Sequence, residues 1–114
     1  MIAWDVFLGG EKWVTTQEMS SFMNRLRGFM CRRQDSLKVD ALWFPDCSAV
    51  HTCFMRFPLD LYYLDADHQI IAVHQNVSGW RLISQRGADS VLEIPSGSQK
   101  VAEEGMTLRF QKCL

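Results

Sequence analysis

Leu59-Asp60-Leu61-Tyr62-Tyr63-Leu64-Asp65-Ala66-Asp67-His68-Gln69-Ile70-Ile71-Ala72-Val73 is the stretch that decides the fold. Its two apolar runs, 59–64 and a second run from 70 that continues to 76, are short and rich in branched and aromatic residues, which is typical of strands. The polar residues 65–68 between them favour a turn. The stretch therefore predicts a β-hairpin.

Short apolar runs on both sides of this hairpin predict further strands. They cover residues 41–44, 49–57, 91–94 and 107–110. Pro45 and Pro58 interrupt the pattern, and a strand interior disfavours proline because its nitrogen cannot donate to the ladder. The sequence therefore predicts a sheet of several short strands.

Two further segments have the spacing and end signals of helices. Residues 16–27 carry apolar side chains at helical offsets, Thr15 and Glu18 have the spacing of a capping box, and Gly28 fits a helix end. A second capping box at 96–99 and Gly105 predict a short helix over 97–104. The sum predicts an α+β domain, a mostly antiparallel curled sheet or small β-barrel with about two α-helices.

Length and charge restrict the classes of protein and partner. At 114 residues, with 47% hydrophobic and 22% charged residues, the chain has the composition of one globular domain spanning 1–114. Its formal charge of -1 provides no field that would hold nucleic acid or an anionic membrane. We therefore expect neither of these partners.

The N-terminus and the cysteines indicate a cytoplasmic protein with reduced thiols. Residues 1–5 lack the features of a secretory signal, and no window approaches the roughly 18 apolar residues of a membrane span. The cysteines show neither a CxxC pair nor the spacing of a zinc site; they are Cys31, Cys47, Cys53 and Cys113. The sequence thus predicts a cytoplasmic location and no metal or cofactor.

Four motifs, in matching order, carry a resemblance to a known family. The central one is Val50-His51-Thr52-Cys53-Phe54-Met55-Arg56-Phe57-Pro58-Leu59-Asp60-Leu61-Tyr62-Tyr63-Leu64-Asp65. The flanking ones are Arg25-Leu26-Arg27-Gly28-Phe29-Met30, Asp46-Cys47-Ser48-Ala49-Val50 and Arg86-Gly87-Ala88-Asp89-Ser90-Val91-Leu92-Glu93-Ile94-Pro95-Ser96-Gly97. Together they resemble the domain-of-unknown-function 192 family, in the branch whose core reads His-Thr-x-x-Met-Arg-Phe-Pro-x-Asp.

The chain departs from that family's pattern at two positions. Met106 follows Gly105 where relatives commonly have aspartate, and Cys53 stands where an aromatic residue is common. Many relatives also carry an export signal. His51, Cys53 and Met55 share one face of a predicted strand, and this soft ligand set would suit copper, but core packing of Cys53 and Met55 is the favoured interpretation.

Asp60 enters an apolar run, and a buried carboxylate needs a cation or several donors. The resemblance places three cations in the same motif set, namely Arg25, Arg56 and Arg86. One interpretation is a structural bridge between Asp60 and an arginine. The other is a ligand-binding cleft formed by His51, Thr52, Arg25, Arg56, Asp60 and Arg86, in which a bulge turns His51 and Thr52 to one side.

Two functions of different classes fit these residues. The first is a non-catalytic binding or accessory module whose cleft takes a small molecule, a glycan or a partner segment, since the chain has no phosphate loop and no clear metal set. The alternative is a small thiol or acid-base enzyme with the candidate catalytic residues Cys47, His51 and Asp60. It requires a turn, because in an extended strand the Cα atoms of Cys47 and His51 lie about 13 Å apart.

Overall fold

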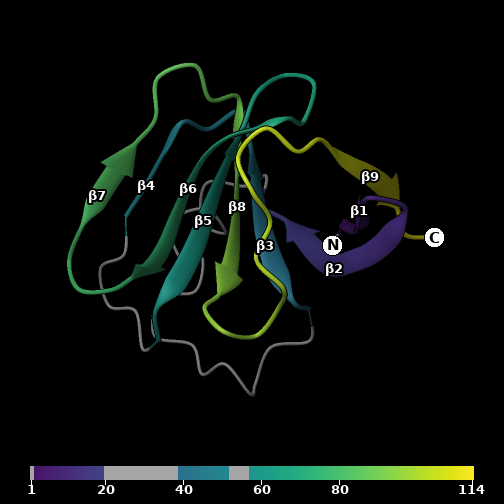
Figure 1. The fold of residues 1–114 in the computed structure, drawn as a ribbon, viewed down its shortest axis with the longest axis horizontal. Coiled ribbons are helices and arrows are strands. Elements are labelled where there is room, and N and C mark those ends of the chain that lie inside the picture. The colour runs from purple at the N-terminus through teal and green to yellow at the C-terminus, as the bar shows by residue number, and fades with distance from the viewer. Residues whose placement is uncertain (1, 20–38, 52–56) are drawn as a thin grey trace.

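The computed structural model describes residues 2–19, 39–51 and 57–114, and these form nine strands and no helix. Figure 1 shows their arrangement. The strands are β1 (Ala3–Leu8), β2 (Glu11–Glu18), β3 (Ala41–Pro45), β4 (Ala49–His51), β5 (Leu59–Leu64), β6 (Ile70–Val77), β7 (Leu82–Ser84), β8 (Ser90–Pro95) and β9 (Leu108–Lys112). The predicted hairpin is present as β5 and β6, which pair antiparallel.

Seven strands form one mixed sheet, in the order β6-β5-β8-β3-β2-β1-β9. Its neighbours pair antiparallel except for β2 and β3, which run parallel with Thr16 opposite Ala41. The strands β4 and β7 form a separate two-stranded ribbon. The part of the chain that the structure describes is therefore all-β.

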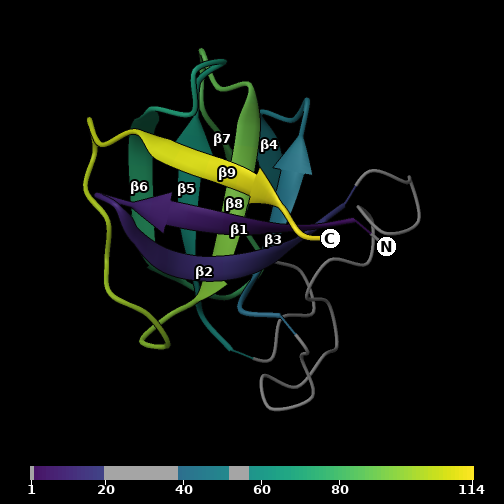
Figure 2. The same cartoon turned by 90° about the vertical axis from the view of Figure 1, so that its right-hand side faces the viewer.

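The large sheet folds over on itself, so that β1, β2 and β9 cross in front of β5, β6 and β8 (Figure 2). The side chains enclosed between these two halves form the inner cluster, which includes Val6, Trp13, Trp43, Tyr62, Leu64 and Leu92. The opposite face of β3, β5 and β8 carries the outer cluster, which includes Leu42, Phe44, Leu61, Tyr63 and Val91 together with Val50 of β4 and Ile83 of β7. Residues that alternate along β5 and β8 thus face two different cores.

The helix predicted over 97–104 is wrong, because the polar groups that would have started it form other hydrogen bonds, one local and one tertiary. The Ser96 hydroxyl donates to Asp60 Oδ1 at 2.7 Å, and the Ser98 hydroxyl donates to the Pro95 carbonyl oxygen at 2.6 Å. Further along, the Ala102 amide donates to the Tyr62 hydroxyl at 3.3 Å rather than to a carbonyl one turn back. The segment is a loop that turns after β8 and runs back to the start of β9 (Figure 1).

The other predicted helix, over 16–27, is wrong at its start. Residues 16–18 continue β2, and both side chains of the expected capping box bind elsewhere. The Thr15 hydroxyl donates to Asp5 Oδ1 at 2.9 Å, and Glu18 accepts from the Trp4 indole at 3.0 Å. Residues 20–27 and Gly28 lie outside the described residues. In the described ranges there is also no helix long and apolar enough to cross a membrane.

The prediction of a small closed barrel is wrong as well, because the seven-strand sheet stays open. Its end strands β6 and β9 approach each other through one isolated bridge, between Gln69 and Thr107, and through the Leu108 amide, which donates to the His68 carbonyl oxygen at 2.9 Å. One edge of the described sheet is thus tied to the other by a few bonds rather than by a full ladder. Together with the loop at 97–104 and the strand at residues 16–18, this finding corrects the α+β prediction for the described residues.

Candidate functional site

The residues predicted to line a cleft do not gather among the described side chains. His51 ends β4 opposite Leu82 and is half-buried. Arg86 is exposed at the turn before β8, whereas Asp60 is buried in β5. Arg25, Thr52 and Arg56 lie outside the described residues, as do Cys53 and Met55. A ligand-binding role for His51, Asp60 and Arg86 stays a prediction.

Asp60 is satisfied by donors from two neighbouring segments. Its Oδ1 accepts from the Ser96 hydroxyl at 2.7 Å and from the Asn76 amide at 3.0 Å. Asp60 pairs with Ile94, a member of the inner cluster, and directly paired residues point to the same face of a sheet. Its carboxylate therefore lies on the inner side of β5, away from the outer cluster that Cys47 adjoins.

Cys47 lies beside the outer cluster at the start of the ribbon. Its thiol donates to the Ala49 carbonyl oxygen at 3.0 Å, and its amide donates to the Asp89 carbonyl oxygen at 3.0 Å. Two residues, Ser48 and Ala49, separate this thiol from Val50, whose side chain is buried in the outer cluster. The hydrogen bond to Ala49 is one that only the protonated thiol can donate.

Glu93 is a buried acid that the sequence analysis did not single out. It is 3% exposed in β8 and pairs with Leu42 of β3 and Leu61 of β5, so it faces the outer cluster. Burial raises the pKa of Glu93 to about 8, which keeps the group largely neutral at pH 7.

Tyr63 fixes the ribbon to the large sheet close to this acid. Its hydroxyl donates to the Ile83 carbonyl oxygen of β7 at 2.6 Å. Burial is the main reason why the pKa of Tyr63 is raised, and the nearby Glu93 and Cys47 add to the effect. The ring also packs edge-on against His74, with 5.6 Å between ring centroids. The surroundings of Glu93 and Tyr63 thus raise the pKa of both groups while their side chains stay packed in the protein.

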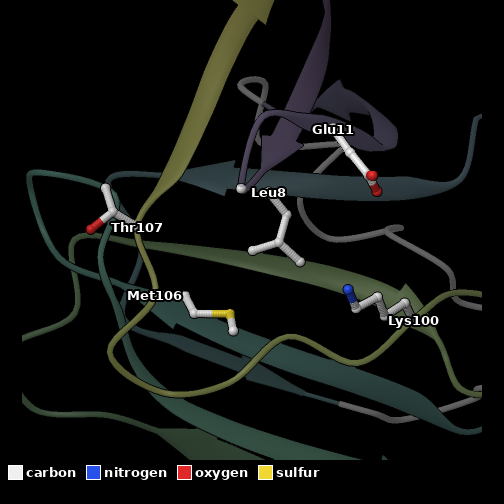
Figure 3. Close-up of a pocket in the computed structure, with 6 residues that line it drawn as sticks. Leu8, Glu11, Lys100, Met106 and Thr107 are labelled. Carbon is white, nitrogen blue, oxygen red and sulfur yellow. The ribbon is translucent and has the colours of Figure 1, made fainter.

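A pocket of about 410 Å³ lies where the tip of the β1–β2 hairpin meets the loop before β9. We call it the mouth pocket. Its lining comprises Leu8, Gly9, Glu11, Lys100, Met106 and Thr107. Figure 3 shows the apolar side chains of Leu8 and Met106 pointing into the hollow, with Glu11 and Lys100 on the same side of it from facing walls.

The turn at the hairpin tip explains why the backbone can form one rim of this pocket. Gly9 and Gly10 have φ values of 60° and 89°, in the left-handed region that suits glycine, and a Cβ atom added to either would meet open space. Gly-Gly between two apolar alternating runs is a hairpin signal. The Gly9-Gly10 pair is the sequence signal that indicates the hairpin of β1 and β2.

The other rim of the mouth pocket is held in place by the inner cluster. The Trp13 indole donates to the Lys100 carbonyl oxygen at 2.7 Å, and the Tyr62 hydroxyl accepts from the Ala102 amide. The rings of Trp13 and Tyr62 pack edge-to-face, 5.1 Å between centroids. At the far end of the loop, the Ile70 amide donates to the Met106 carbonyl oxygen at 2.8 Å. The loop wall of the pocket is thus anchored near both of its ends.

Comparison with known proteins agrees with this architecture and extends along most of the chain. The family model for DUF192, described as "Uncharacterized ACR", matches residues 6–110. The chain belongs to the DUF192 family. The family resemblance predicted from the four motifs is confirmed. No curated protein sequence matches the chain.

Two solved structures are similar to this DUF192 chain. One, a "putative transcription regulator" from Sinorhizobium meliloti 1021, has a TM-score of 0.74 at 20% identity and covers 96% of this chain and 92% of its own. The other, a protein of unknown function from Novosphingobium aromaticivorans DSM 12444, has a TM-score of 0.68 at 17% identity and covers 95% and 84%. At these identities the likeness shows a shared fold.

Proposed function

We propose that this DUF192 protein is a non-catalytic binding module that holds a small molecule in the mouth pocket. The observation that carries the proposal is the pocket itself, whose volume of about 410 Å³ falls in the range of roughly 300 to 1,000 Å³ typical of ligand sites. Leu8 and Met106 offer apolar surface, and Glu11 and Lys100 offer charges that orient a ligand. Such a mixture is what small-molecule sites share.

Anchoring of the loop wall supports the same function. A ligand that enters a preformed pocket does not have to order it, so more of the contact energy appears as affinity. The Trp13 bond to Lys100 and the Tyr62 bond to Ala102 hold the loop wall before any ligand binds. The proposed site therefore lies at the hairpin tip rather than around the motif at residues 50–65.

The formal charge of -1 supports a small ligand rather than nucleic acid as the partner. We also infer that the chain belongs to the branch with the His-Thr-x-x-Met-Arg-Phe-Pro-x-Asp core, on the basis of residues 51–60. The likeness to a "putative transcription regulator" concerns the fold. Direct titration with a DNA duplex of random sequence, in 50 mM salt, should show no binding.

A thermal-shift screen tests the proposed function. The panel contains amino acids, nucleosides, monosaccharides and short carboxylic acids, and a compound at 100 times its Kd stabilises the fold by about 2.7 kcal/mol. Met106→Trp fills the pocket and should abolish the shift. Val101→Trp is the matched control, because Val101 lies in the same loop, is 40% exposed against 38% for Met106, and does not line the pocket.

Two results would overturn the proposal. One is a panel in which no compound shifts the melting of the wild type. The other is a shift that Met106→Trp and Val101→Trp retain equally, because the compound would then bind elsewhere. A shift lost in Met106→Trp and kept in Val101→Trp supports it.

A further inference from the structure

The two charged residues of the mouth pocket, Glu11 and Lys100, also line a second, smaller hollow beside it. Glu11 and Lys100 line the larger hollow of about 410 Å³ and also a neighbouring one of about 170 Å³. Leu8 lines both hollows; Met106 lines the larger one alone, and Lys12, Trp13 and Gln99 line the smaller one alone. A molecule that spans the boundary would meet both charges at one end and apolar surface at the other.

In the part of the chain that the structure describes, Glu11 and Lys100 form no ion pair with each other. Among the described residues an ion pair joins Lys12 to Asp5 at 3.3 Å, and none joins Glu11 or Lys100 to any partner within 4.0 Å. Both side chains are exposed, so water solvates them in the unliganded protein. In Figure 3 the carboxylate of Glu11 and the ammonium group of Lys100 come from facing walls, on one side of the hollow.

A ligand with a single charge fits this arrangement poorly. An anion that pairs with Lys100 would bring its charge near the Glu11 carboxylate, and a cation would do the reverse with Lys100. An uncharged ligand would desolvate both groups and leave them without new partners, which costs free energy. A zwitterion offers each side chain a group of opposite charge and adds no net charge to the site.

We infer that the mouth pocket recognises a free α-amino acid with an aliphatic or thioether side chain. Its ammonium group pairs with Glu11, its carboxylate pairs with Lys100, and its side chain packs between Leu8 and Met106. Met106 and Leu8 are the apolar surfaces available for this contact, and the flexible thioether of methionine adapts to branched or straight side chains. The inference rests on the proposed function and names the ligand class.

Isothermal titration with L-leucine and two of its analogues tests the inference. 4-Methylpentanoate lacks the ammonium group, and 3-methylbutylamine lacks the carboxylate, while both keep the aliphatic end. We expect each analogue to bind at least tenfold more weakly than leucine. Leucine affinity should also fall as salt is raised from 50 to 500 mM, because the two charged side chains are exposed.

Charge-removing variants assign the two ends of the ligand. Glu11→Gln should weaken leucine at least fivefold but should strengthen 4-methylpentanoate, whose charge no longer meets the Glu11 carboxylate. Lys100→Met should likewise weaken leucine but not 3-methylbutylamine. Glu104→Gln is the control for the first variant, since Glu104 is exposed in the same loop and does not line the pocket. Lys112→Met serves in the same way for the second, because Lys112 is exposed on β9.

The outcomes separate this inference from the proposed function. Equal binding of leucine and either analogue, or unchanged leucine affinity in both charge variants, would overturn the inference. If leucine does not bind but another compound of the panel shifts melting in a manner that depends on Met106, the inference fails and the binding module stands. If no compound binds, both fail.

Discussion

The Ser96 hydroxyl donates a 2.7 Å hydrogen bond to Asp60 Oδ1, across 36 residues of sequence. The same oxygen accepts from the Asn76 amide at 3.0 Å, where the β5–β6 pairing shifts register and Asn76 has a φ of 53°. A single carboxylate thus joins the ends of three strands. The two donated hydrogen bonds stabilise this buried acid in the way that a neighbouring cation otherwise would.

Asp60→Ala should lower the free energy of unfolding by about 3 kcal/mol, because two hydrogen bonds to a charged acceptor disappear and the Asn76 amide loses its partner. Ser96→Ala should cost about half as much. Urea denaturation measures both. Ser98→Ala is the comparison, since the Ser98 hydroxyl bonds only locally, to the Pro95 carbonyl oxygen, and should cost about 1 kcal/mol. A neutral effect of Asp60→Ala would contradict this assignment.

The stability of the protein should fall as pH rises from about 4.5 to about 8. Burial raises the folded-state pKa of Glu93 from 4.5 to about 8. Below pH 4.5 the acid is protonated in both states and carries no penalty; between the two values the unfolded chain ionises first, and above pH 8 the penalty is constant. The wild type should lose roughly 3 kcal/mol between pH 5 and pH 8.

Glu93→Gln should remove this dependence, because the amide does not ionise. The free energy of unfolding is measured with urea at pH 5, 6, 7 and 8. Glu104→Gln, at an exposed position, should keep the wild-type profile. The assignment to Glu93 is wrong if Glu93→Gln retains the same slope.

Cys47 should not depend on His51 for its reactivity. Its thiol donates to the Ala49 carbonyl oxygen at 3.0 Å, so its hydrogen-bond acceptor is the backbone rather than an imidazole. We expect the rate at which iodoacetamide alkylates Cys47, followed by mass spectrometry between pH 6 and pH 9, to change less than twofold in His51→Ala. A large drop in the mutant below pH 8 would instead revive the thiol enzyme predicted from sequence.

Cys113 provides an internal reference for the same experiment. Burial, and next the nearby Asp5 carboxylate, raise the pKa of the Cys113 thiol. Because the thiolate is the reacting species, Cys113 should be alkylated slowly at neutral pH and faster as pH rises. Its profile should be the same with and without His51.

Trp13→Phe should loosen the loop wall of the mouth pocket. Phenylalanine keeps a ring against Tyr62 but loses the 2.7 Å bond to the Lys100 carbonyl oxygen, at a cost of about 1 kcal/mol. Hydrogen exchange at the Ala102 amide should quicken, and any ligand of the pocket should bind more weakly. Trp4→Phe is the matched control: it loses an indole bond to Glu18 at 3.0 Å but should leave exchange at Ala102 unchanged.

Two of the strands predicted from the sequence are buried along their whole length. The runs at 59–64 and 91–94 correspond to β5 and β8, both buried at every position. The run at 107–110 corresponds to β9, shifted to Leu108–Lys112. Continuous apolar runs indicate strands locally because both faces of the sheet are covered. The two cores explain why β5 and β8 have this pattern.

The loop at 97–104 shows where local patterns fail. Its capping-box residues have the right spacing for a helix, but Asp60, Tyr62 and Trp13 lie 35 or more residues away and compete for the same polar groups. Local propensity is easily overridden by such tertiary bonds. The hairpin at 3–18, in contrast, was missed although Gly9-Gly10 indicates it.

The mouth pocket could not be predicted from sequence, because its lining comes from the two ends of the chain and contains no motif. Leu8 and Glu11 flank the hairpin turn, and Lys100 and Met106 bound a loop whose course is set by tertiary bonds. Met106 was noticeable as a departure from the family pattern. What it lines follows only from the fold.

The bond between Trp13 and Lys100 spans 87 residues, which has a consequence for synthesis of the protein. On the ribosome, the first hairpin emerges long before its partner loop has been translated, and contacts of such sequence separation close late because they require the largest loss of chain entropy. The recess at the hairpin tip is therefore assembled at the final stage of folding. A nascent or truncated polypeptide ending before residue 100 would lack it.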